Sequence, residues 1–126
     1  MIKLFFDFNG EIPIYQQVAN SIEEGILSNI YKEEEQIPST TEISVTYKIN
    51  PATVGKGFNL LVTNEIIYKK RGVGMFVCNG AKSKLLKKRK DKFFDDYILS
   101  LMEEAKRLGI SKEEIVNMIQ GGYENE

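Results

Sequence analysis

The side chains of this sequence that suit chemistry best are basic and polar groups that bind anions, and they gather at two places. Asn50-Pro51-Ala52-Thr53 is followed closely by Lys56. Lys69-Lys70-Arg71 runs into Gly72-Val73-Gly74. Amide, hydroxyl, ammonium and guanidinium groups hydrogen-bond the phosphates and base edges of duplex nucleic acid. The two places therefore indicate recognition of a polyanion rather than catalysis.

Catalysis and metal binding are disfavoured by what the sequence lacks. It has no histidine, the commonest general base and metal ligand, and a single cysteine, Cys78. It also has no glycine-rich cofactor fingerprint, so we expect neither an enzyme nor a cofactor- or metal-binding protein. No apolar run approaches the roughly 20 residues of a membrane span, and the opening residues do not resemble a signal peptide. We therefore expect a cytoplasmic protein with no membrane partner.

The net charge of −1 conceals an uneven distribution. Residues 37–92 hold twelve Lys and Arg against three Asp and Glu, a net charge of +9. The flanking segments, residues 1–36 and 93–126, each carry a net charge of −5. Because a polyanion meets a surface patch rather than an average over the chain, we expect the central segment to bind nucleic acid. Within it, the lysines from Lys82 to Lys92 fit a solvated helix face better than a base-reading surface.

The sequence before residue 37 predicts a short strand, one helix and a polar connection. Residues 2–8 alternate weakly between apolar and other residues, which favours a strand. Pro13 suits the first position of a helix, because that position has no intrahelical donor to lose. Ser28-Asn29 ends this helix, and residues 30–36 form an acidic connection. The apolar stripe of the helix consists of Tyr15, Val18, Ile22 and Ile26.

Two helices and a hairpin follow in the basic segment. Ser39 and Glu42 have the spacing of a capping box, which starts a short helix. Asn50-Pro51 supplies an N-cap and a first helical residue for the next helix, so the two helices predict a helix-turn-helix. Two β-favouring runs then flank Arg71-Gly72-Val73-Gly74, which predicts a hairpin with a basic tip. Such a tip can reach a minor groove or a row of phosphates.

The last third of the sequence predicts a helical appendage. Residues 83–108 follow a long helical pattern that ends at Gly109, and a second capping box, Ser111 to Glu114, starts a short helix. Gly121-Gly122 is expected to stop that helix, with Ile115, Met118 and Ile119 facing inward. The apolar stripe of the long helix is too wide for one short helix to cover, so we expect a second subunit to cover it. The expected dimerisation residues are Leu86, Phe93, Phe94, Tyr97, Ile98, Leu101 and Met102.

These elements define the expected fold class, which is α+β. A winged helix-turn-helix domain occupies residues 1–80, and a C-terminal helical dimerisation hairpin occupies residues 81–126. The helix that begins at Asn50 is short enough to enter the major groove of duplex DNA.

Residues 13–77, about half of the chain, resemble the N-terminal domain of the GntR family of bacterial transcription regulators. Five motifs occur in the family's order and spacing. They are Pro13-Ile14-Tyr15-Gln16-Gln17, Ile37-Pro38-Ser39, Glu42-Ile43-Ser44, Ile49-Asn50-Pro51-Ala52-Thr53-Val54 and Gly72-Val73-Gly74-Met75-Phe76-Val77. The Asn-Pro-x-Thr-Val variant with a short tail is similar to the YtrA subfamily, in which two C-terminal helices serve dimerisation.

This resemblance implies a homodimeric, sequence-specific DNA-binding regulator, most simply a repressor, that binds a palindromic operator. The resemblance leaves open whether a small-molecule effector exists. The alternative function is a winged-helix protein-interaction module that has lost specific DNA binding. The expected DNA-binding residues are Ser39, Thr41, Asn50, Ala52, Thr53, Lys56, Lys69, Arg71, Gly72 and Gly74.

The sequence departs from the family pattern at three places. Thr41 and Gly55 stand where relatives usually carry arginine, and Lys32-Glu33-Glu34-Glu35 replaces the usual Pro-Gly. Three glutamates repel phosphate if they face DNA. We therefore expect weaker or differently specified DNA binding than in a typical relative. Close helix packing would explain a glycine at position 57, whereas it offers no explanation for Gly55.

Overall fold

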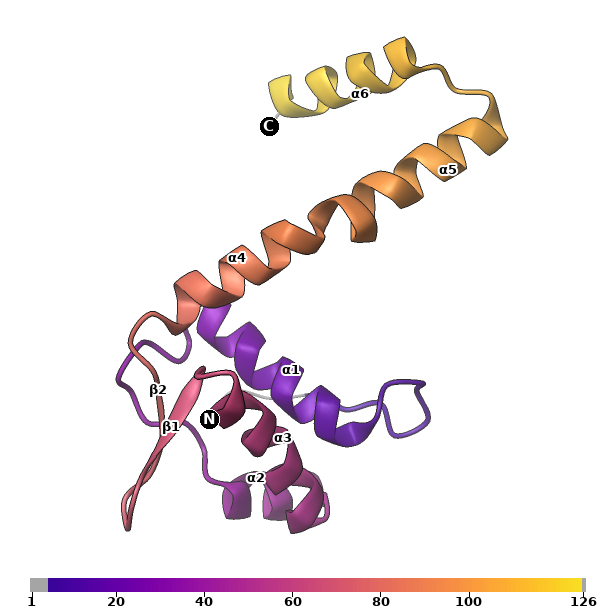
Figure 1. The fold of residues 1–126 in the computed structure, drawn as a ribbon. Helices are drawn as coiled ribbons and strands as arrows, with labels where there is room; N and C mark the ends of the chain where they lie inside the picture. The colour runs from indigo at the N-terminus through magenta and orange to yellow at the C-terminus, as the bar shows by residue number, and fades with distance from the viewer. Residues whose placement is uncertain (1–4, 126) are drawn as a thin grey trace. The chain divides into compact units, whose positions relative to one another are not determined.

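The computed structural model describes residues 5–125, which form two compact units (Figure 1). The N-terminal unit extends to Lys87 and contains three helices, a β-hairpin and the start of a fourth helix. The C-terminal unit begins at Lys88 and is entirely helical. The expected combination of a winged helix-turn-helix with C-terminal helices is confirmed.

The N-terminal unit contains three complete helices, two of which begin at the expected caps. They are α1 (Ile14–Leu27), α2 (Thr40–Tyr47) and α3 (Pro51–Thr63). The Ser39 hydroxyl accepts the N–H of Glu42 at 3.0 Å, and the Glu42 carboxylate accepts the N–H of Ser39, so the capping box is complete. Asn50 caps α3, and Lys48, with a φ of 55°, lets the chain turn between α2 and α3. The predicted helix-turn-helix is therefore confirmed.

The helices and the hairpin share one apolar core. Its most completely buried large side chains are Val18, Ile22, Ile26, Ile43, Val54, Leu61, Ile67 and Val77. Gly57 is needed where α3 packs against α1, because a Cβ added there would lie 2.6 Å from the Tyr15 carbonyl oxygen. Gly55 has open space on its side of the helix. The packing explanation is thus confirmed for Gly57 and is absent for Gly55.

The hairpin consists of strands β1 (Ile67–Lys70) and β2 (Gly74–Val77), as the sequence predicts. The other edge of β2 pairs with the segment that precedes α2. The N–H of Ile37 donates to the Met75 carbonyl at 2.9 Å, and the N–H of Val77 donates to the Glu35 carbonyl at 3.0 Å. The acidic connection is therefore more than a polar loop, because its end pairs with β2 through an isolated bridge between Gln36 and Phe76.

The N-terminal residues differ from the prediction at two points. Residues 5–8 form no strand, and the rest of the expected strand lies outside the described residues. The Gln17 side chain satisfies the Asp7 backbone instead, since its Oε1 accepts the Asp7 N–H at 2.7 Å and its Nε2 donates to the Asp7 carbonyl at 2.8 Å. Pro13 precedes α1 rather than opening it, because its ψ of 147° is extended.

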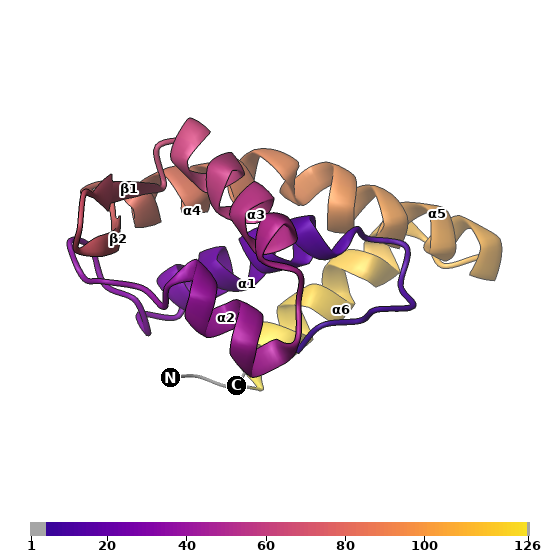
Figure 2. The same ribbon diagram turned by 90° about the horizontal axis from the view of Figure 1, so that it is seen from below.

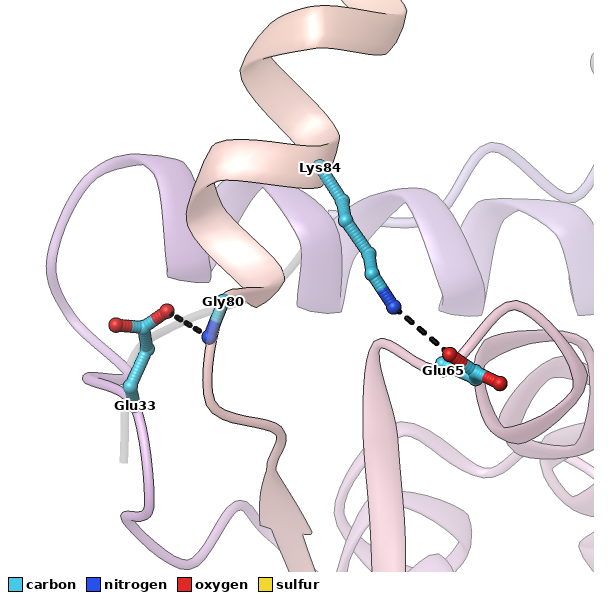
Figure 3. A network of polar contacts seen from close by, with 4 residues as sticks. All are labelled: Glu33, Glu65, Gly80 and Lys84. Carbon is cyan, nitrogen blue, oxygen red and sulfur yellow. Dashed lines mark hydrogen bonds and ion pairs between the residues drawn. The ribbon is translucent and has the colours of Figure 1, made fainter.

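Helix α4 (Ala81–Phe93) begins within the N-terminal unit, and polar contacts hold its start, two of which Figure 3 shows. The Glu33 carboxylate accepts the N–H of Gly80, directly before the helix. Lys84 forms an ion pair with Glu65 at 3.0 Å. The hydrogen bond and charge of Lys84 hold the pKa of the Glu65 carboxyl below its ordinary value. Buried Ala81 and Leu85 extend the core to this first part of α4.

The C-terminal unit contains the end of α4, a π-helical segment η1 (Phe94–Ile98), α5 (Leu99–Leu108) and α6 (Lys112–Glu124). The chain reverses after α5, where Gly109 has a φ of 70° (Figure 2). Helix α6 begins at the predicted Ser111 capping box. The predicted stop at Gly121-Gly122 is wrong: α6 continues through both glycines, because glycine lowers helix stability without forcing the chain out of a helix.

Candidate nucleic-acid interface

The start of α3 presents the side chains predicted to read DNA. Asn50, Ala52 and Lys56 are exposed, and Thr53 is half-buried. The Asn50 Oδ1 atom accepts the N–H of Ala52 at 2.8 Å as a helix cap. The amide nitrogen of the same side chain can donate to DNA at the same time, so capping and DNA contact are compatible at this residue.

The start of α2 combines a phosphate seat with an opposing charge. Ser39 is half-buried and Thr41 is exposed at the first turn, where backbone N–H groups have no intrahelical partner. Such a helix end favours phosphate. Glu42 lies in the same turn as part of the capping box, and its negative charge offsets this preference. With threonine rather than arginine at position 41, α2 offers neutral hydrogen bonds only.

Lys56 is not a freely extended side chain. Its Nζ lies 4.0 Å from the centre of the Tyr15 ring, so a cation–π contact joins α3 to the start of α1. Tyr15 is half-buried and was expected in the apolar stripe of α1. The structure thereby places a phenol beside the basic group of α3. A tyrosine at the very start of an apolar stripe is the signal that could have suggested this pairing.

The basic residues of the hairpin divide between its two faces. Side chains alternate along a strand, so Lys69 shares a face with the core residue Ile67, and Lys70 shares the opposite face with Tyr68. The Lys70 Nζ lies 4.4 Å from the centre of the Phe76 ring on that opposite face. Lys69 and Arg71 are both exposed, and Arg71 lies in the tip. The three charges therefore do not form one cluster.

The tip depends on its two glycines. The N–H of Val73 donates to the Lys70 carbonyl at 2.9 Å, which closes the turn. Gly72 has a φ of 77° and Gly74 a φ of 145°, both in a region that side chains disfavour. At Gly74, moreover, an added Cβ would overlap the amide nitrogen of Gln36.

The three glutamates that replace the family's Pro-Gly each have a partner within the unit. Besides Glu33 at the start of α4, Glu34 accepts the Tyr68 hydroxyl at 2.7 Å and Glu35 accepts the Lys32 N–H at 2.8 Å. The hydrogen bond to Glu34 raises the pKa of Tyr68. Glu34 thus contacts the hairpin, Glu33 the start of α4 and Glu35 its own turn, so all three carboxylates have local partners even though their side chains are exposed.

The DNA-reading candidates lie on one side of the N-terminal unit. In Figure 1, α2, the start of α3 and the tip of the hairpin all reach the lower side of that unit. A winged helix binds duplex DNA with one helix in the major groove and its hairpin beside that helix. The helix and the basic hairpin must therefore lie on the same side of the domain.

The C-terminal unit exposes its apolar stripe. Ile98 is half-buried, and the other predicted dimerisation residues are exposed by 37% to 65% of their surface, although one of them, Leu86, lies at the end of the N-terminal unit. An apolar groove of about 400 Å³ runs between α5 and α6, with Leu101, Ala105, Ile115 and Ile119 among its lining residues. Met118 was expected to face inward with Ile115 and Ile119, but it is 59% exposed and does not line the groove.

These features define a winged helix-turn-helix protein of the kind that regulates transcription. Residues 14–77 match the family model described as bacterial regulatory proteins, gntR family. The match spans half of the chain and all the motifs from the start of α1 to the end of β2. The chain therefore belongs to the GntR family and is a winged-helix transcriptional regulator.

Known relatives extend the similarity beyond the family model. The chain is 28% identical to the HTH-type transcriptional repressor YtrA of Bacillus subtilis (strain 168), over 95% of this chain and 97% of YtrA. It is 38% identical to a putative GntR-family transcriptional regulator from Bacteroides thetaiotaomicron, whose crystal structure matches with a TM-score of 0.71 over 89% of this chain and 97% of that one. The similarity to YtrA, short C-terminal helices included, is confirmed.

The fold of the N-terminal unit also occurs in a protein solved with its operator. The DNA-binding domain of AraR, in complex with operator ORX1, is 24% identical and matches with a TM-score of 0.55 over 61% of this chain and 96% of that chain. Across residues 5–125, no helix has the length and apolar character to cross a membrane.

Proposed function

We propose that the protein is a homodimeric repressor that binds a palindromic DNA operator. Residues 1–80 contact DNA and residues 81–126 join the two subunits. The protein acts by binding rather than by catalysis, and it works in the cytoplasm, where DNA is. The observation that carries the proposal is that the exposed start of α3 and the tip of the hairpin lie on one side of the N-terminal unit.

Two groups of residues have separate parts in this function. Thr53 and Lys56 meet base edges and nearby phosphates from α3, while Lys69 and Arg71 reach an adjacent groove from the hairpin. The starts of α2 and α3 contact the DNA backbone through Ser39, Thr41, Asn50 and Ala52. The shape of the hairpin tip depends on Gly72 and Gly74. AraR, which shares the fold of this unit, was solved in complex with operator ORX1, and this supports binding in the same manner.

The C-terminal helices support the dimer. Helix α6 has no buried residue, and isolated helices of this length are marginal in water. A second subunit that covers the stripe and the groove supplies the missing burial. Two-fold symmetry then places two recognition helices against two half-sites, about one helical turn of DNA apart or in nearby phase.

The experiment that tests the function is selection of bound duplexes from a random pool at two salt concentrations. We expect enrichment of inverted half-sites and an affinity that falls steeply with salt, because phosphate contacts release counterions. Arg71→Ala should weaken binding to the selected duplex by about 1–3 kcal/mol if the tip reads bases. Arg107→Ala, which removes an exposed arginine of α5, is the matched control. Failure to enrich any duplex at low salt would instead support the protein-interaction alternative.

A further inference from the structure

A single side chain joins the tip of the hairpin to the segment that leads into α2. The Gln36 Nε2 atom donates to the carbonyl of Val73 at 3.0 Å, across 37 residues of sequence. Val73 lies in the turn beside Arg71, and its side chain is 60% exposed. The bond therefore reaches the part of the hairpin farthest from the apolar core.

Neighbouring contacts hold both the backbone of Gln36 and its side-chain amide in place. The Gln36 backbone bridges Phe76 of β2, and the next residue, Ile37, is buried in the core. Gly74 leaves the space that the Gln36 amide fills, because a Cβ at that position would overlap it. The amide therefore packs against the hairpin backbone as well as hydrogen-bonding to it.

The link matters because a two-stranded hairpin has little stability of its own. The four-residue strands bury Ile67 and Val77 at the base of the hairpin, whereas the residues of the tip are exposed. Gln36 lies three residues before Ser39, the N-cap of α2, so it connects the tip directly to the helix-turn-helix. A tip held in place before binding loses less conformational freedom when DNA binds.

We propose that Gln36 is a positioning residue, which holds the Arg71 tip at a fixed place relative to the helix-turn-helix. The proposal rests on the DNA-binding function proposed above and adds a residue outside the recognition helix and outside the hairpin. It also gives Gly74 a second reason to be glycine. Gln36 acts on DNA affinity through Arg71, and it does not itself read bases.

The first test needs no DNA. Gln36→Met has a similar length but no donor, whereas Gln36→Lys restores a donor. In the full-length protein we expect amide hydrogen exchange of residues 70–74 to quicken by about 3- to 10-fold in the Met variant, equivalent to one neutral hydrogen bond. The Lys variant should recover most of the protection. Gln16→Met, which removes a glutamine of α1 bonded to Asn20, should leave the hairpin unchanged. Unchanged exchange in Gln36→Met overturns the proposal.

The second test is a double-mutant cycle with Arg71→Ala on the selected duplex. Gln36→Met should raise the Kd about 3- to 10-fold in the wild-type background and by less than about twofold when Arg71 is absent. When Gln36→Met is combined with Lys56→Ala, the effects of the two substitutions on the free energy of binding should be additive. Additive effects with Arg71→Ala would show that Gln36 does not act through the tip. If no duplex binds, the function proposed above fails, and the exchange measurement still decides whether Gln36 holds the hairpin.

Discussion

The two units of this protein differ in how much of their own apolar surface they bury. The described part of the N-terminal unit places sixteen buried apolar residues in one core. In the described part of the C-terminal unit, Ala105 alone is buried, whereas Phe93, Tyr97 and Leu101 remain exposed. The first unit therefore has an apolar core of its own, whereas the described apolar side chains of the second unit stay largely exposed.

The difference follows from how the elements are layered. Three helices and a hairpin enclose a volume between them, so each contributes one face to a shared interior. The C-terminal helices form an open pair, with a groove instead of an interior between α5 and α6. The comparison teaches that the N-terminal unit has a core of its own, whereas in the function proposed above the C-terminal helices gain their burial from a second subunit.

The largest effect should come from a charge placed in the C-terminal groove. Leu101→Asp would bury an unpaired carboxylate in the proposed dimer interface, which costs about 3–5 kcal/mol. We expect the dimer to dissociate into monomers in sedimentation velocity, with the circular dichroism of the N-terminal unit retained. Ser100→Asp adds the same charge one residue earlier, at an exposed polar position, and serves as the control. If Leu101→Asp remains a dimer, the exposed stripe of the C-terminal unit is not the dimer interface.

A cavity in the N-terminal core should have the next largest effect. Ile22→Ala removes a fully buried side chain and should lower the free energy of unfolding by about 2–5 kcal/mol in urea denaturation. Val45→Ala, at a position 73% exposed on α2, should change it by less than about 0.5 kcal/mol. Equal effects of the two substitutions would mean that the N-terminal unit has no core of its own.

Alanine substitutions at two glycines of α3 should change the stability of the N-terminal unit in opposite directions. Gly57→Ala forces α3 away from the Tyr15 carbonyl and should destabilise the unit by about 1–3 kcal/mol. Gly55→Ala meets open space and should stabilise it by about 0.5–1 kcal/mol, because alanine favours the helix. The unfolding temperatures of both variants, compared with that of the wild type, measure the two effects. The same sign for both would refute the close packing of α1 against α3.

The smallest effect concerns the ion pair at the start of α4. The pKa of Glu65 is lowered in the folded state, so its contribution is present at neutral pH and disappears as the pH falls through that lowered value. The free energies of unfolding of wild type and Glu65→Gln should therefore differ slightly at neutral pH and converge as the pH falls through the lowered pKa of Glu65. The difference should be small because both side chains are largely exposed. A difference that grows in acid would contradict the assigned direction.

Local signals explain how much of the fold could be predicted. The capping boxes at Ser39 and Ser111 and the cap at Asn50 lie within four residues of their partners, so sequence spacing alone specifies them. The turn around Gly72 is equally local. Family motifs then connected these elements to a known class of regulator.

Interruptions in the long helix were harder to foresee. The pattern at 83–108 predicted one regular helix, and the structure contains the π-helical segment η1 within it. A π-helical turn bonds each N–H to the carbonyl five residues earlier and so places one extra residue in the turn, and composition carries no sign of this change. The continuation of α6 through Gly121-Gly122 has a similar origin, because glycine permits a helix and its end alike.

The sequence by itself determined the capped starts of α2, α3 and α6, the hairpin and the placement of positive charge in the central segment, because each depends on neighbours a few residues apart. Only the tertiary structure decided which residues meet across the chain. Lys56 lies over Tyr15, Glu34 accepts from Tyr68, and Gln36 holds Val73. The physical reason is that these contacts join residues 34 to 41 positions apart, and such pairs become neighbours only after the helices and strands pack on one core.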